Sequence, residues 1–204
     1  MKQIFTTLPP KMQQQKKKAV EAPLEVGALP FPLKFLQGQA AFEVVKIEKI
    51  FNCVIYDKFA NEFNRVIRKN PEKKLKDICK HLFHGTRGTD PKLLYQGEDG
   101  LDIRFAAAGY YGTGSYFANN SHYSTGYAFD AGNGLMQMFV CTVLVGDFVC
   151  LPKNNQLRIP PLKDVNDPTK GRYDSVCGQD VGHWITYDNS KAYPGYLISY
   201  RQRQ

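Results

Sequence analysis

The chain has 204 residues, of which 23% are charged and 13% are aromatic, and its formal net charge at pH 7 is +8. This length suits one domain with a substantial core and a short tail, and the positive charge favours an acidic partner. No apolar run reaches the ~20 residues that a membrane-spanning helix needs, and residues 1–20 lack the apolar stretch of a signal peptide. The sequence therefore predicts an intracellular protein with no membrane partner, in either the nucleus or the cytoplasm.

The cysteines and histidines show no metal-binding or disulfide pattern. The five cysteines are scattered and form no C-x-x-C pair, which argues against a zinc knuckle and against a secreted disulfide framework. We interpret Cys141 and Cys150, which lie in or beside an apolar strand, as small core residues. The four histidines form no Glu-x-x-His or His-x-x-x-His step, so no metal site is expected.

Two segments hold much of the positive charge. Residues 1–34 combine a Lys16-Lys17-Lys18 triplet with several prolines and glutamines, a composition that predicts a flexible leader or a fragment edge before a folded domain at 35–204. A second basic cluster runs from Arg68 to Lys80. We interpret it as solvated helix surface, which makes a nucleic-acid partner the less favoured reading.

The first elements of the folded part are a strand and a long helix. Apolar residues predict a strand at 44–50, and residues at helical spacing predict a helix at 52–69. Asn52 is a suitable N-cap, and the Asn70-Pro71 step ends the helix. A second short helix is expected at 72–79.

From residue 81 onward, short β-like runs are separated by glycine and asparagine. Strands are predicted at 81–84, 115–118, 135–145, 147–151, 183–187 and 196–200, helices at 91–96 and 121–127, and loops over 97–115 and 152–182. The first of these helices has Thr89 or Asp90 as N-cap and Pro91 at its first position. Helices followed by short strands predict an α+β fold with a mainly antiparallel sheet.

Several common enzyme classes are excluded by missing motifs. The sequence has no G-x-S-x-G nucleophile elbow and no G-x-x-x-x-G-K phosphate loop. The Gly112-x-Gly114 pair is too short for a dinucleotide fingerprint, and a strand follows it where that fingerprint requires a helix.

A series of short motifs nevertheless follows a family order. They are Leu82-Phe83-His84-Gly85-Thr86, Gly100-Leu-Asp-x-Arg104, Gly112-x-Gly114-x-Tyr116-Phe117-Ala118, Ser124 with Tyr127, the strand from Met138 to Gly146, Tyr173-Asp-Ser-Val176, and Ala192-Tyr-Pro-x-Tyr-Leu-Ile198. In this order the chain resembles the catalytic domain of the poly(ADP-ribose) polymerase (PARP) family, and its 100–118 segment is most similar to the tankyrase branch. The resemblance implies the ADP-ribosyltransferase fold, with two packed antiparallel β-sheets and flanking helices.

The resemblance also implies a site for NAD as co-substrate, with no metal. His84 would hydrogen-bond the ribose hydroxyls on the adenosine side. Gly85 would offer its backbone to the nicotinamide amide, where a side chain would block the approach, and Ser124 would add a further hydrogen bond. Tyr127 would stack on one face of the nicotinamide ring, and Tyr116 would lie against the other side of the ring.

The same resemblance points to three further residues. Ala118 follows Tyr116 on the predicted strand and is a candidate NAD contact. Arg104 and Asp102 lie in the loop that would cover the pocket, and Arg104 is assigned to NAD binding.

One position departs from the family pattern. Members that build polymers carry a glutamate thirteen residues before the tyrosine of the Tyr-Leu-Ile strand, and this chain has His183 there. Asp180 is three residues earlier and would face the other side of the strand. The implied catalytic set is therefore His84, Tyr116 and His183. A neutral imidazole accepts a hydroxyl hydrogen bond but supplies no negative charge.

The sequence leaves more than one function open. The leading hypothesis is an NAD-dependent mono-ADP-ribosyltransferase that transfers ADP-ribose to protein side chains and releases nicotinamide. The alternative is a catalytically weak or inactive module that binds NAD or ADP-ribose. A third reading, a nucleic-acid binder that uses the basic segments, would be favoured by salt-sensitive binding to an oligonucleotide.

Overall fold

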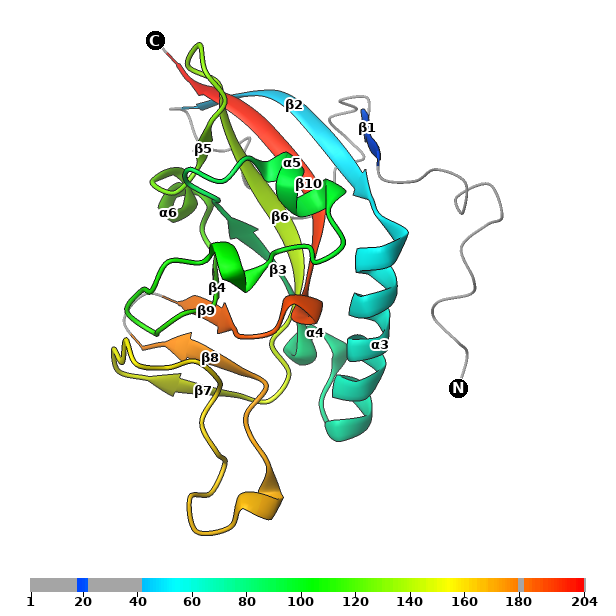
Figure 1. Cartoon of the computed structure of the whole chain (residues 1–204), viewed down its shortest axis with the longest axis vertical. Coiled ribbons are helices and arrows are strands. Elements are labelled where there is room, and N and C mark those ends of the chain that lie inside the picture. Colours follow the sequence, from blue (N-terminus) through cyan, green and yellow to red (C-terminus); the bar gives the residue numbers. More distant parts are fainter. Residues whose placement is uncertain (1–17, 22–41, 180–181, 204) are drawn as a thin grey trace.

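The computed structural model describes residues 18–21, 42–179 and 182–203 (Figure 1). In chain order the elements are β1 (Lys18–Glu21), β2 (Phe42–Phe51), α3 (Cys53–Lys69), α4 (Leu75–Ile78), β3 (Cys79–His84), α5 (Pro91–Gln96), η1 (Ile103–Phe105), β4 (Ser115–Ala118), α6 (Ser121–Thr125), β5 (Phe129–Asp130), β6 (Met136–Leu144), β7 (Phe148–Leu151), η2 (Pro168–Lys170), β8 (Ser175–Gly178), β9 (His183–Thr186), η3 (Asn189–Lys191) and β10 (Ala192–Gln202). The predicted α+β class is confirmed. Of the predicted leader 1–34, β1 falls within the described residues and the rest lies outside them.

The strands form one hydrogen-bonded path with two halves. Their order is β1-β2-β10-β6-β3-β4-β9-β8-β7, with β5 against β6. Within the described strands only the β7–β8 pair is parallel. In Figure 1, β7, β8 and β9 run in a different direction from β2, β6 and β10. The two halves meet where β3 lies beside β4. In the described chain, these two strands share a single register pair, Phe83 with Ala118. The structure thus has one continuous, mostly antiparallel sheet where the resemblance implies two packed sheets.

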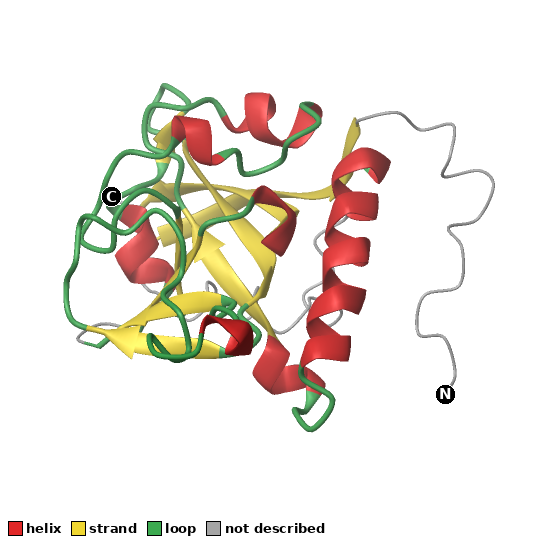
Figure 2. Cartoon of the chain, turned by 60° about the horizontal axis from the view of Figure 1, so that its bottom comes forward, coloured by secondary structure: helices red, strands yellow, loops and turns green. Residues whose placement is uncertain are grey.

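Helix α3 forms where the sequence predicts it. The Asn52 side-chain oxygen accepts hydrogen bonds from the backbone N–H groups of Val54 and Ile55 at 3.1 and 3.2 Å. The Asn52 amide also donates to the Tyr95 and Gly97 carbonyls at 3.0 and 2.8 Å, which ties the helix start to the end of α5. This cap satisfies two of the N–H groups that a helix start leaves unpaired. Figure 2 shows α3 standing along one side of the sheet, with most loops on the opposite side.

Strands β8 and β10 show the largest differences from the sequence prediction. Strand β8 lies in 152–182, which the sequence predicts as loop, and all four of its residues are buried. A strand covered on both faces shows no alternation of apolar and polar residues, so the usual signal is absent. Strand β10 starts at Ala192 instead of Tyr196, and its register shifts between Pro194 and Tyr196. This bulge accommodates a proline that has no N–H to donate.

One cysteine was also wrongly assigned. Cys150 is exposed on β7, whereas Cys141 is fully buried as predicted. Because β7 is the last strand in the sheet order, no further described strand lies beside it to cover Cys150.

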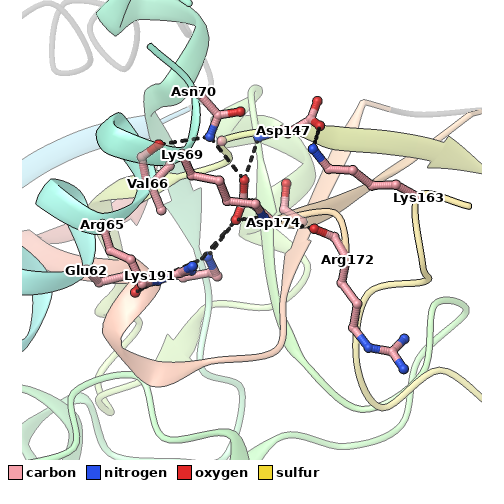
Figure 3. A network of polar contacts seen from close by, with 12 residues as sticks. Glu62, Arg65, Val66, Lys69, Asn70, Asp147, Lys163, Arg172, Asp174 and Lys191 are labelled. Carbon is pink, nitrogen blue, oxygen red and sulfur yellow. Dashed lines mark hydrogen bonds and ion pairs between the residues drawn. The ribbon is translucent and has the colours of Figure 1, made fainter. Parts of the chain in front are cut away.

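The buried Asp174 is the centre of an ion network that joins α3 to both halves of the sheet (Figure 3). Its carboxylate lies 2.9 Å from Lys69 Nζ at the end of α3 and 3.6 Å from Lys191 Nζ just before β10. It also accepts the Asp147 N–H at 2.9 Å. Lys191 is itself buried and pairs with Glu62 of α3 at 2.7 Å. These pairs fix the helix against the sheet, because separating them would leave buried charges uncompensated.

The network also sets the charge state of its carboxyl groups. Burial alone would raise the pKa of Asp174, but hydrogen bonds from Asp147 and Lys69 and the nearby Lys191 outweigh it, and the pKa lies below its ordinary value. The same balance lowers the pKa of Glu62. The stability that these groups contribute is therefore present above the unfolded-state pKa of ~4 and lost as the pH falls through the lower folded-state pKa.

Asp174→Asn should lower the free energy of unfolding by ~3–5 kcal/mol at neutral pH, because Lys69 and Lys191 would lose a buried counter-charge. The difference from wild type should shrink as the pH falls below ~4, where Asp174 itself becomes protonated. Urea titrations at several pH values measure both effects. Asp164→Asn removes an ion pair with an exposed lysine and should cost less than ~1 kcal/mol. Equal losses in the two variants would contradict the role assigned to the network.

Candidate active site

A cavity of about 780 Å³ is lined by the end of β3, by β4, α6 and the start of β9, and by the loops at 101–114 and 155–158. Its size suits a drug-sized or cofactor-sized ligand. Among the residues that the sequence singles out, those that line it are His84, Gly85, Asp102, Tyr116, Ala118, Ser124, Tyr127 and His183. The cavity therefore brings together groups from both halves of the sheet.

His84 lies at the end of β3 and is held by β4. Its Nδ1 is 2.7 Å from the Tyr116 carbonyl oxygen. A carbonyl can only accept, so Nδ1 donates and the neutral ring keeps Nε2 as an acceptor. Burial lowers the pKa of His84, and the bond to the Tyr116 carbonyl only partly opposes this. His84 can therefore accept a hydrogen bond from a ligand hydroxyl at neutral pH.

Gly85 is in close contact with the backbone of Tyr127. A Cβ atom at Gly85 would lie 2.2 Å from the Tyr127 carbonyl oxygen, which leaves no space for any side chain. The same carbonyl accepts the Arg87 N–H at 2.8 Å. The Arg87 guanidinium lies over the Tyr127 ring, 4.4 Å from its centre. These contacts lock the segment after β3 against the segment after α6.

Tyr123 is a site residue that sequence reasoning missed. Its ring centre is 4.1 Å from that of His183 and 5.2 Å from that of Tyr127, and the two tyrosine hydroxyls are 2.9 Å apart. Tyr123 lies four residues before Tyr127, a spacing that brings side chains together at a helix surface and could have signalled the pair. Burial, and then the hydrogen bond to Tyr127, raise the pKa of Tyr123 to about 12, so its phenol is neutral.

His183 opens β9 and pairs in register with Ala118 of β4. The residue is only 6% exposed, and within the described part of the chain its Nε2 has no hydrogen-bond partner. Burial lowers the pKa of His183, so its ring is neutral at physiological pH. A buried polar atom without a partner is rare in folded proteins and marks a place where a ligand group can bind. Asp180, the nearby acidic residue, lies outside the described residues.

Tyr116 shapes the cavity through its hydroxyl. The hydroxyl accepts the Tyr111 N–H and donates to the Gly112 carbonyl, both at 2.8 Å. A Cβ atom at Gly109 would lie 2.7 Å from this hydroxyl, so the turn can approach only because it has a glycine there. Tyr116 therefore holds the 109–112 turn beside the cavity.

The structure places Arg104 outside the cavity lining. Its exposed guanidinium bonds the Asp102 carboxylate at 2.8 Å and the Asp99 carboxylate at 2.6 Å. The hydrogen bond from Arg104 lowers the pKa of Asp102, so this carboxylate is ionised and already paired. Two arginines that sequence reasoning did not single out, Arg87 and Arg158, line the cavity instead. The lining thus carries positive charge that suits an anionic ligand.

The described ranges contain no group of three or more His, Cys, Asp or Glu side chains that could hold a metal ion. In the same ranges, no helix is both long and apolar enough to cross a membrane.

Comparison with known proteins assigns this chain to a family. Residues 36–181 match the poly(ADP-ribose) polymerase catalytic domain. The chain belongs to this family of ADP-ribosyltransferases. It is also 39% identical over 165 residues to a probable poly [ADP-ribose] polymerase of Dictyostelium discoideum, an alignment that covers 80% of this chain and 46% of that protein. The chain thus spans about half the length of this curated relative. PARP domains use NAD as a substrate. Neither match distinguishes the tankyrase branch.

In this PARP domain, Gly85→Ala should push the segments at 85 and 127 apart, because the new Cβ would overlap the Tyr127 carbonyl. We expect the affinity for benzamide, a nicotinamide mimic, to fall at least about tenfold, or ~1.4 kcal/mol. Gly88→Ala is the matched control, since a Cβ at Gly88 meets no atom within 4 Å. Calorimetric titration of both variants measures the difference. Equal affinities would show that the close approach at Gly85 does not shape the site.

Proposed function

We propose that this chain is an NAD-dependent mono-ADP-ribosyltransferase, which transfers a single ADP-ribose unit to a protein side chain and releases nicotinamide. The observation that carries the proposal is the buried, neutral His183 in the cavity of a PARP domain, at the position where polymer-forming members have a glutamate. The other groups that a bound NAD would need line the same cavity.

The cavity offers complementary groups for the nicotinamide, ribose and diphosphate parts of NAD. The Gly85 backbone and the hydroxyl of the buried Ser124 would hydrogen-bond the nicotinamide amide, and the Tyr127 ring would stack on the nicotinamide. His84 Nε2 would accept a ribose hydroxyl hydrogen bond. Arg87 and Arg158 supply positive charge for the diphosphate. Each group is of the chemical type that its partner requires.

The side chain at position 183 would determine whether one ADP-ribose unit or a chain of units is transferred. When the nicotinamide–ribose bond breaks, nicotinamide leaves with the bonding electron pair and positive charge grows on the ribose. A nucleophilic atom of the acceptor then bonds to that carbon and loses its proton. A carboxylate at 183 would offset the positive charge and activate a second ribose hydroxyl, whereas neutral His183 can only hold a hydroxyl. A slow, single transfer is the expected outcome.

A second function, NAD or ADP-ribose binding without catalysis, is supported by the charge of the cavity. Among the described lining residues Asp102 is the one acidic group, and Arg104 neutralises it. No free carboxylate of the described lining is thus available to stabilise the positive ribose. Acceptor proteins could bind such a module through an ADP-ribose that they already carry.

Tyr127→Ala should weaken benzamide binding by ~1–3 kcal/mol, because the ring would lose its stacking surface. Tyr127→Phe keeps the ring and loses only the hydroxyl bond to Tyr123, so it should bind within about threefold of wild type, or ~0.7 kcal/mol. Calorimetry reads both affinities. If Tyr127→Ala binds benzamide like wild type, the nicotinamide does not stack on this ring.

Intact mass spectrometry after incubation with NAD and candidate acceptors should show single ADP-ribose units and no chains. His183→Glu should raise the rate of NAD cleavage, with a tenfold gain for each ~1.4 kcal/mol of barrier removed. His183→Gln is the matched control, because it offers hydrogen bonds without charge and should not gain. Linked ADP-ribose units on one side chain of the wild type would refute the proposal. NAD binding without turnover in both wild type and His183→Glu would favour the binding module.

A further inference from the structure

Two cysteines face each other at the outer edge of the second half of the sheet. Cys150 of β7 and Cys177 of β8 are direct partners in the parallel register. Directly paired residues point to the same face, and adjacent strands lie ~4.7–4.9 Å apart. That spacing falls within the ~4.4–6.8 Å between Cα atoms that disulfides require. Both thiols are free in the structure.

The surroundings make the pair unequal. Cys150 is exposed on the edge strand, whereas Cys177 is only 7% exposed. Cys177 also pairs in register with Trp184 of β9. Lys80 places its Nζ 5.0 Å from the centre of the Trp184 ring. Cys150, Cys177 and Trp184 thus form a row across three strands that runs from solvent into the core.

We propose that Cys150 and Cys177 are a peroxide-sensitive pair that closes reversibly to an intrachain disulfide. The exposed Cys150 sulfur attacks hydrogen peroxide, the O–O bond breaks, and sulfenic acid and one water form. The Cys177 sulfur then attacks the Cys150 sulfur, the S–O bond breaks, and the hydroxyl leaves as a second water with the Cys177 proton. The two sulfurs are oxidised and the peroxide is reduced, so atoms and electrons balance.

The burial and pKa of Cys177 support the first step, in which peroxide reacts at Cys150. Burial, and then the hydrogen bond with the Cys150 thiol, raise the pKa of Cys177 to about 12. Cys177 is therefore protonated and shielded at neutral pH, which leaves Cys150 as the first site of attack. Short strand β7, paired on one side in the described sheet, can adjust its position to complete the bond.

The remaining cysteines have no such partner in the described sheet. Cys79 pairs with Leu144, and Cys141 pairs with Leu82 and Pro194. Cys53 lies at the start of α3. The inference is independent of the proposed function, because it concerns only the β7–β8 edge. The pair nevertheless lies on the same half of the sheet as His183.

The test is oxidation with hydrogen peroxide, followed by alkylation of free thiols and peptide mapping without reduction. The chain has five cysteines, so one disulfide should leave three thiols that can be alkylated. The peptides that contain Cys150 and Cys177 should be linked. Trp184 is the single tryptophan, so its emission should fall when the neighbouring disulfide forms and recover with dithiothreitol.

Variants make the result specific. Cys150→Ser and Cys177→Ser should each abolish the linked peptide and the change in Trp184 emission, whereas Cys53→Ser should retain both. Full alkylation of Cys150 and Cys177 after peroxide treatment would overturn the proposal. So would a disulfide between two chains, or Cys150 oxidised to sulfinic acid while Cys177 stays free.

Discussion

The buried carboxylate of Asp174 is the interaction on which the rest of the arrangement depends. It is contacted by Lys69 from the end of α3 and by Lys191 from the turn between β9 and β10. The two halves of the sheet otherwise share little register at β3 and β4. The cavity takes His84 from one half and His183 from the other, so its geometry depends on how the halves are held together.

The cavity combines neutral rings with positive charge. Burial keeps His84 and His183 uncharged, and the carboxylate of Asp102 is already paired with Arg104. Such a lining can bind an anionic dinucleotide and orient its nicotinamide. It offers little to stabilise positive charge on the ribose or to activate a second ribose. The proposed single transfer and the alternative of binding without catalysis both rest on this property of the site.

Local signals made part of the fold predictable. Asn52 caps α3, Asp90 and Pro91 start α5, and the β4 bounds match the prediction, because caps and short apolar strands are encoded by neighbouring residues. Strand β8 and the first part of β10 were missed, since burial on both faces and a bulge at Pro194 hide the usual patterns. In the candidate site, the order of the family motifs predicted several residues that line the cavity, among them His84, Ser124 and His183. The Tyr123–His183 contact and the pairing of Arg104 with two aspartates depend on folded geometry.

The most direct measurement is a crystal structure of the chain with bound benzamide. We expect the benzamide amide to bond the Gly85 backbone and the Ser124 hydroxyl, with the benzamide ring stacked on Tyr127 and within reach of the Tyr123–His183 pair. Benzamide bound elsewhere, or bound in the cavity without an amide contact to Gly85, would contradict the claim that this cavity is the nicotinamide site.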